Sequence, residues 1–360
     1  MSIDDTVQLS QPDLLNKLFK NFQKKIEGKG PYDTPAPPGS HVLRADDDAA
    51  KLTKEEQQEY RSGVGSLLYL LKHSRPDLSN AVRELSKSMD GATEAHQKLL
   101  YRAIRFVSDT RDWKLLLEPK KQVKWEIKAY SDSDFAGDAD TRRSVSGYVV
   151  YLMGCPIAWR SKGQKSVTLS STEAEYVALS ELSTEVLFIR SILEFLGLDV
   201  EYPIIVHVDN IGAVYLANSA CGSNRTKHVD TRYHFVREYV EDGILKIIYV
   251  KSDDNDADVM TKNIAGQYYH KHADSIMRGG NKRMIDDDEN RKGVKMCAET
   301  RDVVFTSSGS SGANETLGAI DTLCANETQR QYVTTEGSSS ALTRGRRSET
   351  TGEPDRRDFI

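Results

Sequence analysis

Cysteine is scarce in this sequence, and apolar residues never run on for long. The chain has 360 residues and only four cysteines, which lie far apart without a Cys-x-x-Cys pair at Cys155, Cys221, Cys297 and Cys324. That spacing indicates neither a disulfide framework nor a zinc knuckle, and it favours a reducing compartment. No run reaches the roughly 18 apolar residues needed to span a bilayer, so we expect no membrane partner.

The chain also lacks a strong net charge. Its 49 Lys and Arg residues against 54 Asp and Glu residues give a formal charge of −5. No global basic field attracts it to nucleic acid, so any such contact must come from local basic clusters. The first residues, Met-Ser-Ile-Asp-Asp, have no apolar signal-peptide segment, and we therefore expect an intracellular location.

Helical patterns fill the first third of the chain. An apolar stripe over 12–26 predicts a helix, and a proline-containing polar linker follows to about residue 50. From Thr53, where Thr53-x-x-Glu56 predicts a capping box, helices are expected to about residue 108. One of them begins near Pro76, since proline suits a first helical position. The region offers no evident chemistry.

From about residue 121 to 262, strands alternate with helices. The pattern predicts strands at 122–131, 145–153 and 156–160, with a weaker signal at 166–170. It then predicts a helix at 172–196, a strand at 203–209, helices at 211–218 and 229–242, a strand at 244–250, and a last helix from near Asn255. A meander followed by such units indicates an α/β fold with a mixed sheet and flanking helices.

The last part of the chain has a different composition. After about Gly279, Ser, Thr, Gly, Glu and Arg dominate, and apolar residues are few. Too little apolar surface is present to offset the entropy cost of ordering the chain. We therefore expect a disordered, low-complexity tail over 280–360.

Four acidic residues fall where the predicted sheet would gather them. Asp132 is expected to end the first strand and Asp209 the strand at 203–209, while Glu175 and Asp258 lie near helix starts. Ligands of open α/β sheets bind beyond the carboxyl ends of the strands. Carboxylates, water and phosphate oxygens are the ligands that Mg²⁺ prefers, and two ions about 4 Å apart can promote in-line displacement at phosphorus. A shared ion would explain why four carboxylates are tolerated together.

Each acid also has a purely structural alternative. Asp132 could be a turn residue, Glu175 the capping-box partner of Thr172, Asp209 part of a helix cap, and Asp258 a favourable charge at a helix N-terminus. Asp254 and Asp256 are equally available acids in the last loop. Spacing alone leaves the metal site and these alternatives open.

Motifs in this region also carry a family resemblance. They are Tyr-Ser-Asp-Ser-Asp-Phe-Ala-Gly-Asp at 130–138, Arg-Ser-Val-Ser-Gly-Tyr at 143–148, Ile-Ala-Trp-Arg-Ser-Lys at 157–162, Leu-Ser-Ser-Thr-Glu-Ala-Glu-Tyr at 169–176, Val-Asp-Asn at 208–210, the Lys-His-Val-Asp segment at 227–238 and Ala-Asp-Val-Met-Thr-Lys at 257–262. In this order they resemble the ribonuclease H domain of Ty1/copia-type retrotransposon polyproteins. Residues 60–69 and 75–78 resemble the reverse transcriptase thumb and connection, and 12–40 the end of its polymerase domain.

The resemblance implies an architecture. A ribonuclease H-like mixed five-stranded sheet with flanking helices is expected over 121–265. A helical thumb- or connection-like region is expected at 51–120, preceded by a remnant of the polymerase end and linker at 1–50. Expected partners are an RNA–DNA hybrid and the rest of a retroelement polyprotein, in a cytoplasmic retroelement particle or in the nucleus.

The resemblance also implies a chemistry, namely cleavage of the RNA strand of RNA–DNA hybrids with two Mg²⁺ ions, Mn²⁺ being an alternative. Carried over by motif, the catalytic and metal-binding residues are Asp132, Glu175, Asp209 and Asp258. Candidate phosphate contacts, each of which could equally belong to a solvated basic face, are Arg142, Arg143, Arg160, Lys162 and Lys165.

Two departures from the family pattern limit this interpretation. No Tyr-x-Asp-Asp motif occurs and residues 1–40 are too short for a palm, so we expect a retroelement fragment without polymerase activity. The segment 251–256 lacks the His that some cellular ribonucleases H carry before the last Asp. A catalytically silent nucleic-acid-binding remnant is the alternative. An integrase or transposase is disfavoured, because its acidic set would close with a Glu on a helix.

Overall fold

The structure is a computed structural model, and it describes residues 6–46, 48–219 and 235–277. The tail expected at 280–360, and the part of the expected helix at 229–242 before Phe235, lie outside the described residues. No helix in the described ranges combines the length and the apolar character needed to cross a membrane.

The N-terminal part is helical, close to the expected ranges. Thr53 and Glu56 form the expected capping box, in which each side chain accepts a hydrogen bond from the other residue's backbone N–H. Pro12 and Pro76 stand at the first positions of their segments, where a missing N–H costs no helical hydrogen bond. The elements are α1 (Pro12–Ile26), α2 (Lys54–His73), a 3-10 turn (Pro76–Leu78), α3 (Ser79–Ser86) and α4 (Glu94–Asp109).

One hydrophobic core joins these helices. Phe22 of α1, Tyr60 of α2 and Leu100 of α4 are each at most 2% exposed within it. Tyr269 and Ala273 of α9 (Gly266–Met277) belong to the same cluster. The core therefore extends across the boundaries expected at residues 50 and 265, and the division into domains stays a prediction.

A short two-stranded sheet was not expected from the sequence. Its strands, β1 (Val7–Leu9) and β2 (Leu115–Leu117), pair antiparallel although about a hundred residues separate them. Three residues are too few to show the alternation by which a strand is recognised.

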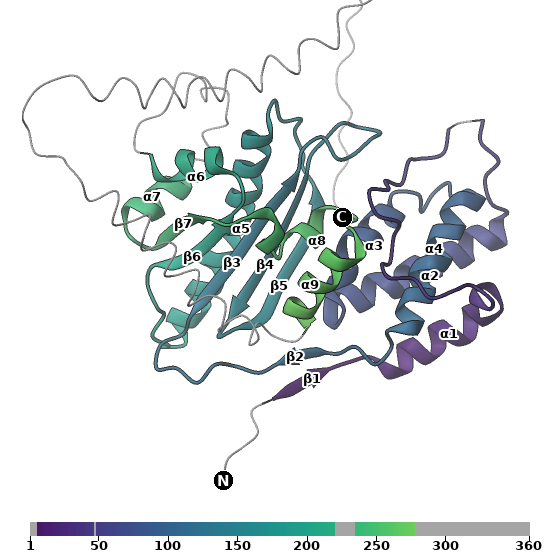
Figure 1. The fold of residues 1–360 in the computed structure, drawn as a ribbon, viewed down its shortest axis with the longest axis horizontal. Helices are drawn as coiled ribbons and strands as arrows, with labels where there is room; N and C mark the ends of the chain where they lie inside the picture. The colour runs from purple at the N-terminus through teal and green to yellow at the C-terminus, as the bar shows by residue number, and fades with distance from the viewer. Residues whose placement is uncertain (1–5, 47, 220–234, 278–360) are drawn as a thin grey trace, which may run out of the picture. The chain divides into compact units, whose positions relative to one another are not determined.

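The main sheet has five strands in the order β5-β4-β3-β6-β7 (Figure 1). β4 is antiparallel to its neighbours β3 and β5, whereas β6 is parallel to both β3 and β7. This is the ribonuclease H-like mixed sheet that the resemblance implies. The strands are β3 (Ile127–Asp134), β4 (Val145–Leu152), β5 (Cys155–Gly163), β6 (Ile204–Val208) and β7 (Leu245–Tyr249).

Two expected strands differ from those observed. The strand expected at 122–131 begins at Ile127 and continues to Asp134, because its last residues pair with the start of β4 (Asp134 with Val145). Asp132 therefore lies inside the strand and not at its end. No strand forms at 166–170, where the chain instead leads into the cap of the next helix.

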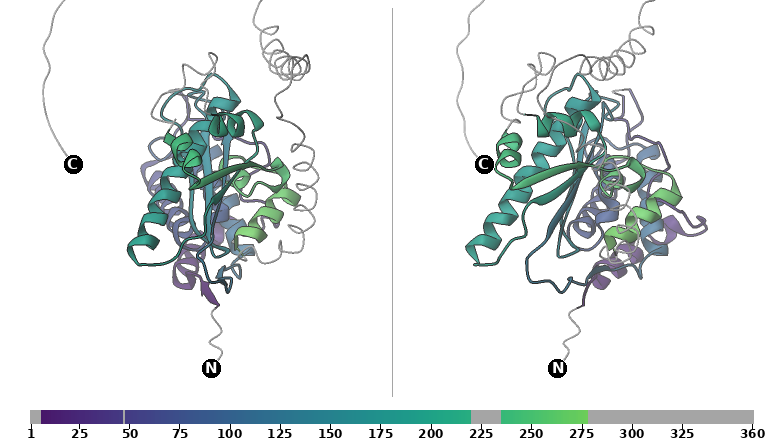
Figure 2. Two further views of the ribbon diagram at one scale, coloured as in Figure 1. Left: turned by 90° about the vertical axis from the view of Figure 1, so that its left-hand side faces the viewer. Right: turned by 60° about the vertical axis from the view of Figure 1, so that its left-hand side comes forward.

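Helices cover both faces of the sheet (Figure 2). Alternate residues of β3 and β4 belong to hydrophobic cores on opposite faces of the sheet. Ala129 and Val150 pack with α5 (Ser171–Phe195), α6 (Ile211–Asn218) and α7 (Phe235–Glu241). Tyr130 and Val149 pack with α8 (Asp258–Thr261) and α9 on the other face. A helix does start near Asn255, as expected, but it is short and is not the last one. That segment is a 3-10 turn (Ser252–Asp254) followed by α8 and α9, separated at 262–265.

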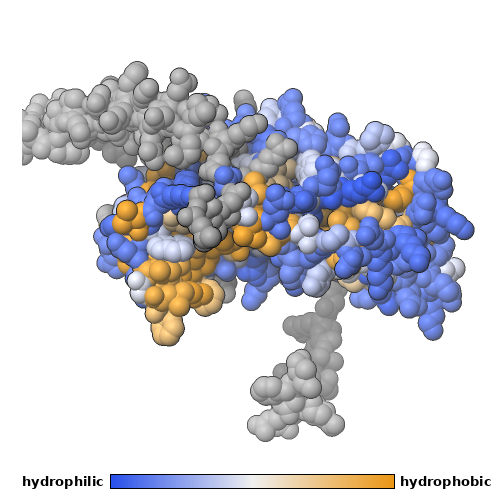
Figure 3. Space-filling model, turned by 90° about the horizontal axis from the view of Figure 1, so that it is seen from below, coloured by the Kyte–Doolittle hydropathy of each residue, from blue (hydrophilic) through white to orange (hydrophobic). Residues whose placement is uncertain are grey.

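The two ends of α5 differ in character. Its first turns lie beside the carboxyl end of β3, whereas its last turns expose Phe188 (60%), Ile192 (43%) and Phe195 (90%) at helical spacing. Figure 3, which views the molecule from below, shows apolar residues (orange) gathered at the lower left. At 1.5 Å per residue, roughly 30 Å separates this stripe from the start of the helix.

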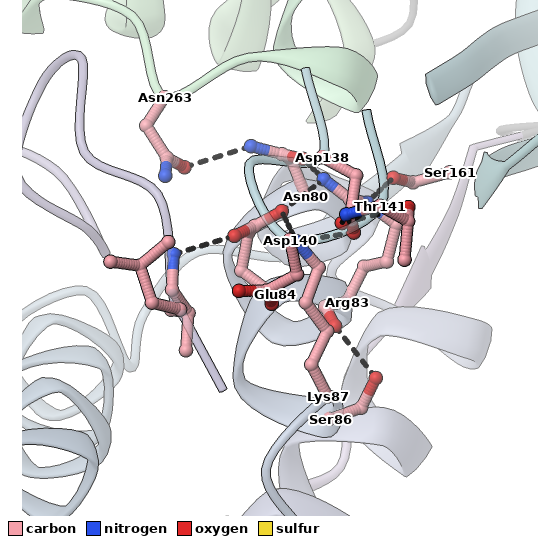
Figure 4. Close-up of polar contacts among 12 residues, drawn as sticks. Asn80, Arg83, Glu84, Ser86, Lys87, Asp138, Asp140, Thr141, Ser161 and Asn263 are labelled. Atoms are coloured by element: carbon pink, nitrogen blue, oxygen red, sulfur yellow. Dashed lines mark hydrogen bonds and ion pairs between the residues drawn. The ribbon is translucent and has the colours of Figure 1, made fainter. Parts of the chain in front are cut away.

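A buried ion network joins the helical part to the sheet (Figure 4). Glu84 of α3 is 1% exposed, and its carboxylate pairs with Arg83 and Lys87 and accepts the Val42 N–H at 2.7 Å. The Lys87 ammonium also lies 2.9 Å from Asp138 in the loop between β3 and β4. The network thus connects α3 to the linker and to the loop that follows Asp134.

Replacing Glu84 by Ala should lower the free energy of unfolding by about 3 kcal/mol, because the partly buried Arg83 and Lys87 each lose one anionic partner and the Val42 N–H loses its acceptor. The control is Glu94→Ala, which removes an ion pair to Lys98 whose side chains are 75% and 67% exposed. That change should cost about 0.5 kcal/mol or less. Urea unfolding of both variants measures the difference, and equal losses would contradict the assignment.

Candidate metal centre

Asp132 lies in the central strand, near its carboxyl end. Its side chain is fully buried, and it pairs with Gly147 of β4. On the other side, the parallel register of Ser131 with Val208 brings Asp132 next to Asp209, the residue that follows β6. The Thr261 hydroxyl of α8 donates a hydrogen bond to Asp132 Oδ2. Parallel strands that end at one edge therefore place two carboxylates side by side.

Glu175 reaches the same place from α5. The helix is capped by Ser170, whose hydroxyl accepts the Glu173 N–H at 3.1 Å, so the alternative in which Glu175 and Thr172 form the cap is wrong. Glu175 is 5% exposed, and its Oε1 accepts the Ser133 N–H at 3.0 Å. Glu175 thus faces the end of β3, while Glu173 serves the helix start.

Asp209 is not a helix cap either. The neighbouring Asn210 caps α6, since its side-chain oxygen accepts the Ala213 N–H at 3.0 Å. Asp209 Oδ2 instead accepts the Ser252 hydroxyl at 2.7 Å. Its carboxylate is held in place by a hydrogen bond from the loop that precedes α8.

Three acids of that last segment, Asp254, Asp256 and Asp258, have different partners. Asp254 pairs with Lys271 at 2.7 Å, on the surface. Asp256 is 1% exposed and bonds to three residues of the sheet and α9, namely Tyr151, His272 and Ser275. Asp258 begins α8, and it is the acid whose charge acts on Asp209. Of the three, Asp258 is therefore the one associated with the site.

The carboxylates form a compact, largely buried cluster in which they act on one another's pKa. Oxygens of Asp132, Glu175 and Asp209 lie within 4.8 Å of one another. Burial, and then the charges of Asp132 and Asp209, raise the pKa of Glu175 well above its usual range. Burial, and then Asp132, raise the pKa of Asp209 to about 6 and that of Asp258 above its ordinary value. The charge of Asp132 thus makes ionisation of Glu175, Asp209 and Asp258 harder.

Among the residues that the structure describes, the cation bonded to these carboxylates is Lys262. The Lys262 ammonium lies 2.8 Å from Asp258 Oδ1 and 3.3 Å from Asp132 Oδ2. Burial alone lowers the pKa of Lys262, but the charges of Asp132 and Asp258 reverse that effect and raise it above the ordinary value. Sequence reasoning assigned this lysine no role, although Asp258 and Lys262 have the i,i+4 spacing of a helical ion pair.

The five basic residues expected to contact phosphate lie elsewhere. Arg142 and Arg143 are exposed in the loop between β3 and β4, and Lys165 is exposed before α5. Lys162 and Arg160 are partly buried on β5, where Arg160 lines a groove of about 420 Å³ between that strand, α2 and α3. In the described part of the chain, the cation on the four carboxylates is Lys262 and none of these five, whose role stays a prediction.

Known proteins resemble this chain over more than half of its length. No protein-family model matches it. The "Retrovirus-related Pol polyprotein from transposon RE2" of Arabidopsis thaliana is 43% identical over 207 residues, which cover 58% of this chain and 14% of the polyprotein. The corresponding polyprotein from transposon TNT 1-94 of Nicotiana tabacum is 34% identical over 260 residues, covering 71% of this chain and 19% of the polyprotein. The chain thus matches less than a fifth of the length of these relatives.

Among solved structures, ribonuclease H1 of the archaeon Halobacterium salinarum NRC-1 is 17% identical to this chain. The match covers 38% of this chain and 94% of the ribonuclease. The TM-score between the two structures is 0.26. The fold follows instead from the strand order β5-β4-β3-β6-β7 and the strand directions. The homologues of this chain are retrovirus-related Pol polyproteins of copia/Ty1-type transposons, and its five-stranded sheet is a retroelement ribonuclease H-like domain.

Proposed function

We propose that this domain is a metal-dependent endonuclease that hydrolyses the RNA strand of RNA–DNA hybrids. The observation that carries the proposal is the cluster of Asp132, Glu175 and Asp209, three acids of three separate elements with oxygens within 4.8 Å. The Asp-Glu-Asp-Asp set implied by the family resemblance falls on these residues and Asp258. Similarity to part of the Pol polyproteins supports a substrate class in which RNA and DNA strands are paired.

The residues present fit a divalent ion. All ligands are carboxylate oxygens, which suit Mg²⁺ or Mn²⁺. Glu175 Oε2 is buried and has no hydrogen-bond partner among the described residues. Asp132, Glu175 and Asp209 would hold one ion, and Asp132 with Asp258 a second. Ions bound there supply Lewis acidity, which activates water and stabilises charge that develops on phosphate oxygens.

The chain's own groups would prepare the site for that chemistry. The Ser133 N–H fixes one oxygen of Glu175, which leaves the other to accept a hydrogen bond from the attacking water and so orient it. The Thr261 hydroxyl fixes Asp132, and the Ser252 hydroxyl fixes Asp209. Ligands held in this way lose little conformational entropy when an ion and a phosphate bind.

The direct test is cleavage of an RNA–DNA hybrid, labelled on either strand, by the purified chain. With Mg²⁺ the RNA strand alone should be cut, and EDTA should stop the reaction. Asp132→Asn removes a ligand charge without changing side-chain shape, and it should lower the rate at least about 100-fold. The control, Asp199→Asn, changes an exposed acid on the loop before β6 and should cleave like the wild type.

A folded chain that binds the hybrid without cutting it would contradict the proposal. That outcome would leave the alternative of a catalytically silent nucleic-acid-binding remnant. Equal cutting of duplex RNA would contradict hybrid specificity, which requires the enzyme to sense both the 2′-hydroxyl of one strand and the shape of the other.

Asp209→Asn should make the metal-free protein more stable, and more so at high pH. Because the folded-state pKa of Asp209 is about 6, against an ordinary 3.8, the folded protein binds this proton more tightly than the unfolded chain does. The resulting stability is present below pH 3.8 and lost as pH rises through 6. At pH 8 the amide avoids this loss, so the free energy of unfolding should rise by about 2 kcal/mol.

Urea unfolding in EDTA at pH 8 and pH 4.5 measures this effect, with Asp253→Asn, an exposed acid nearby, as the control that should show no pH-dependent gain. Added Mg²⁺ should stabilise the wild type more than Asp209→Asn, because the variant binds the ion less tightly. A variant less stable than the wild type at pH 8 would contradict the electrostatic account.

The double change Arg142→Gln with Arg143→Gln tests the phosphate contacts. Each lost phosphate contact should reduce the slope of log K against log salt by about 0.7 to 0.9. Filter binding of an RNA–DNA hybrid in EDTA, at salt concentrations between about 50 and 200 mM, measures this slope. Over that range, the affinity of a protein with several phosphate contacts falls about ten-fold or more. The control is Lys17→Gln with Lys20→Gln on exposed positions of α1. An unchanged slope would assign both arginines to a solvated face.

A further inference from the structure

Lys262 occupies the space between two of the four acids. Its ammonium lies 2.8 Å from Asp258 Oδ1, and 3.4 and 3.3 Å from the two oxygens of Asp132. Asp258 is the first residue of α8 and Lys262 directly follows the helix, so the pair lies on one side of a single turn. The compact group of Asp132, Glu175 and Asp209 does not include Asp258.

We propose that the Lys262 ammonium occupies the position that a second divalent ion needs, so that the domain binds one ion readily and the second only when Lys262 moves away. The inference rests on the proposed function, since it concerns how the same site is loaded. Lys262 would then set the metal-ion concentration at which the two-ion state forms.

Geometry prevents both cations from using the same oxygens. Mg²⁺ sits about 2.0–2.1 Å from each ligand oxygen and requires near-octahedral surroundings. The ammonium already takes Asp258 Oδ1 and faces both oxygens of Asp132, one of which also accepts the Thr261 hydroxyl. An ion bridging Asp132 and Asp258 would therefore have to displace the ammonium from at least one of them.

Charge works in the same direction. Four ionised carboxylates and one ammonium leave three negative charges, of which one divalent ion in the compact group neutralises two. A second divalent ion would then enter a site with a single negative charge remaining, next to an ammonium that repels it. Without Lys262 the same ion would meet two remaining negative charges.

The lysine is also the partner that can move. Asp132 is fixed by its strand and by Thr261, and it is fully buried. The Lys262 side chain is 36% exposed and follows the end of a four-residue helix. Its flexible four-carbon stem can adopt other rotamers. Displacement therefore requires a side-chain rotation and leaves the sheet unchanged.

The test is metal binding by the full chain, measured by calorimetry and by electron paramagnetic resonance of Mn²⁺, without any substrate. Metal-free wild type should bind one Mn²⁺ and a second at least about ten times more weakly. Lys262→Met keeps the apolar stem and removes the charge, so the second dissociation constant should fall at least about ten-fold, and by more than the first. Lys262→Arg keeps the charge and should retain a weak second site.

The matched control is Lys271→Met, which removes an ammonium bonded to Asp254 on the surface close to the same loop. It should bind both ions like the wild type. If Lys262→Met does not fold, as judged by circular dichroism, Lys262→Gln offers the same loss of charge in a more polar side chain. A second dissociation constant within two-fold of wild type in the folded charge-removing variant overturns the proposal.

Hybrid cleavage separates the two claims. A wild type that cuts the RNA strand while Lys262→Met leaves the second ion's affinity unchanged would overturn this inference and leave the proposed function intact. A wild type that binds Mn²⁺ in the expected unequal way, with the second site strengthened by Lys262→Met, supports the inference even where no hybrid is cut. A wild type with two equally tight sites overturns it.

Discussion

Mutual repulsion among four carboxylates at one end of a sheet is the constraint to which the surrounding structure responds. Asp132 is buried in the central strand, where a lone charge would be very costly. Gly147 beside it has no side chain: a Cβ there would lie 2.5 Å from Thr261 Cγ2 and 2.7 Å from Met260 Cβ. The glycine therefore lets α8 approach the sheet, and with α8 come the Thr261 hydroxyl and the Lys262 ammonium that satisfy Asp132.

Much of this arrangement could be predicted from the sequence, because it follows from local patterns. The apolar patterns indicate the strands β3 and β6. Because these strands run parallel, their carboxyl ends lie at the same end of the sheet, which brings Asp132 and Asp209 together. The capping box at Thr53 and the short helix after Asn210 were also readable, since they depend on residues within one turn. The exact end of β3 was not, because the polar residues after Asp132 stay in the ladder only through pairing with β4.

The partners of individual acids depended on contacts that no local pattern contains. Asp256 and Asp258 are equivalent by spacing, and only the packing of α9, which brings His272 to within 3.0 Å of Asp256, makes one structural and leaves the other for the site. Lys262 was equally unreadable. A lysine at a helix C-terminus is favoured by the helix dipole in any protein, and only the arrival of Asp132 from a strand 130 residues earlier gives it a second partner.

The position of α8 also depends on the helical part of the chain. Asn263, the residue after Lys262, accepts a hydrogen bond from Asn80 of α3 at 2.9 Å and donates one to the Ser40 carbonyl at 2.7 Å. Tyr269 of α9 donates to Asp77 at 2.9 Å within the helical core. The segment from Lys262 to α9 is thus fixed at both ends, at Asn263 and at Tyr269. Its partners there, Ser40, Asp77 and Asn80, all precede the sheet in the sequence. The geometry of the acidic site is therefore a property of the helical part and the sheet together, and a sheet expressed without α3 would lose the contacts that hold α8 against Asp132.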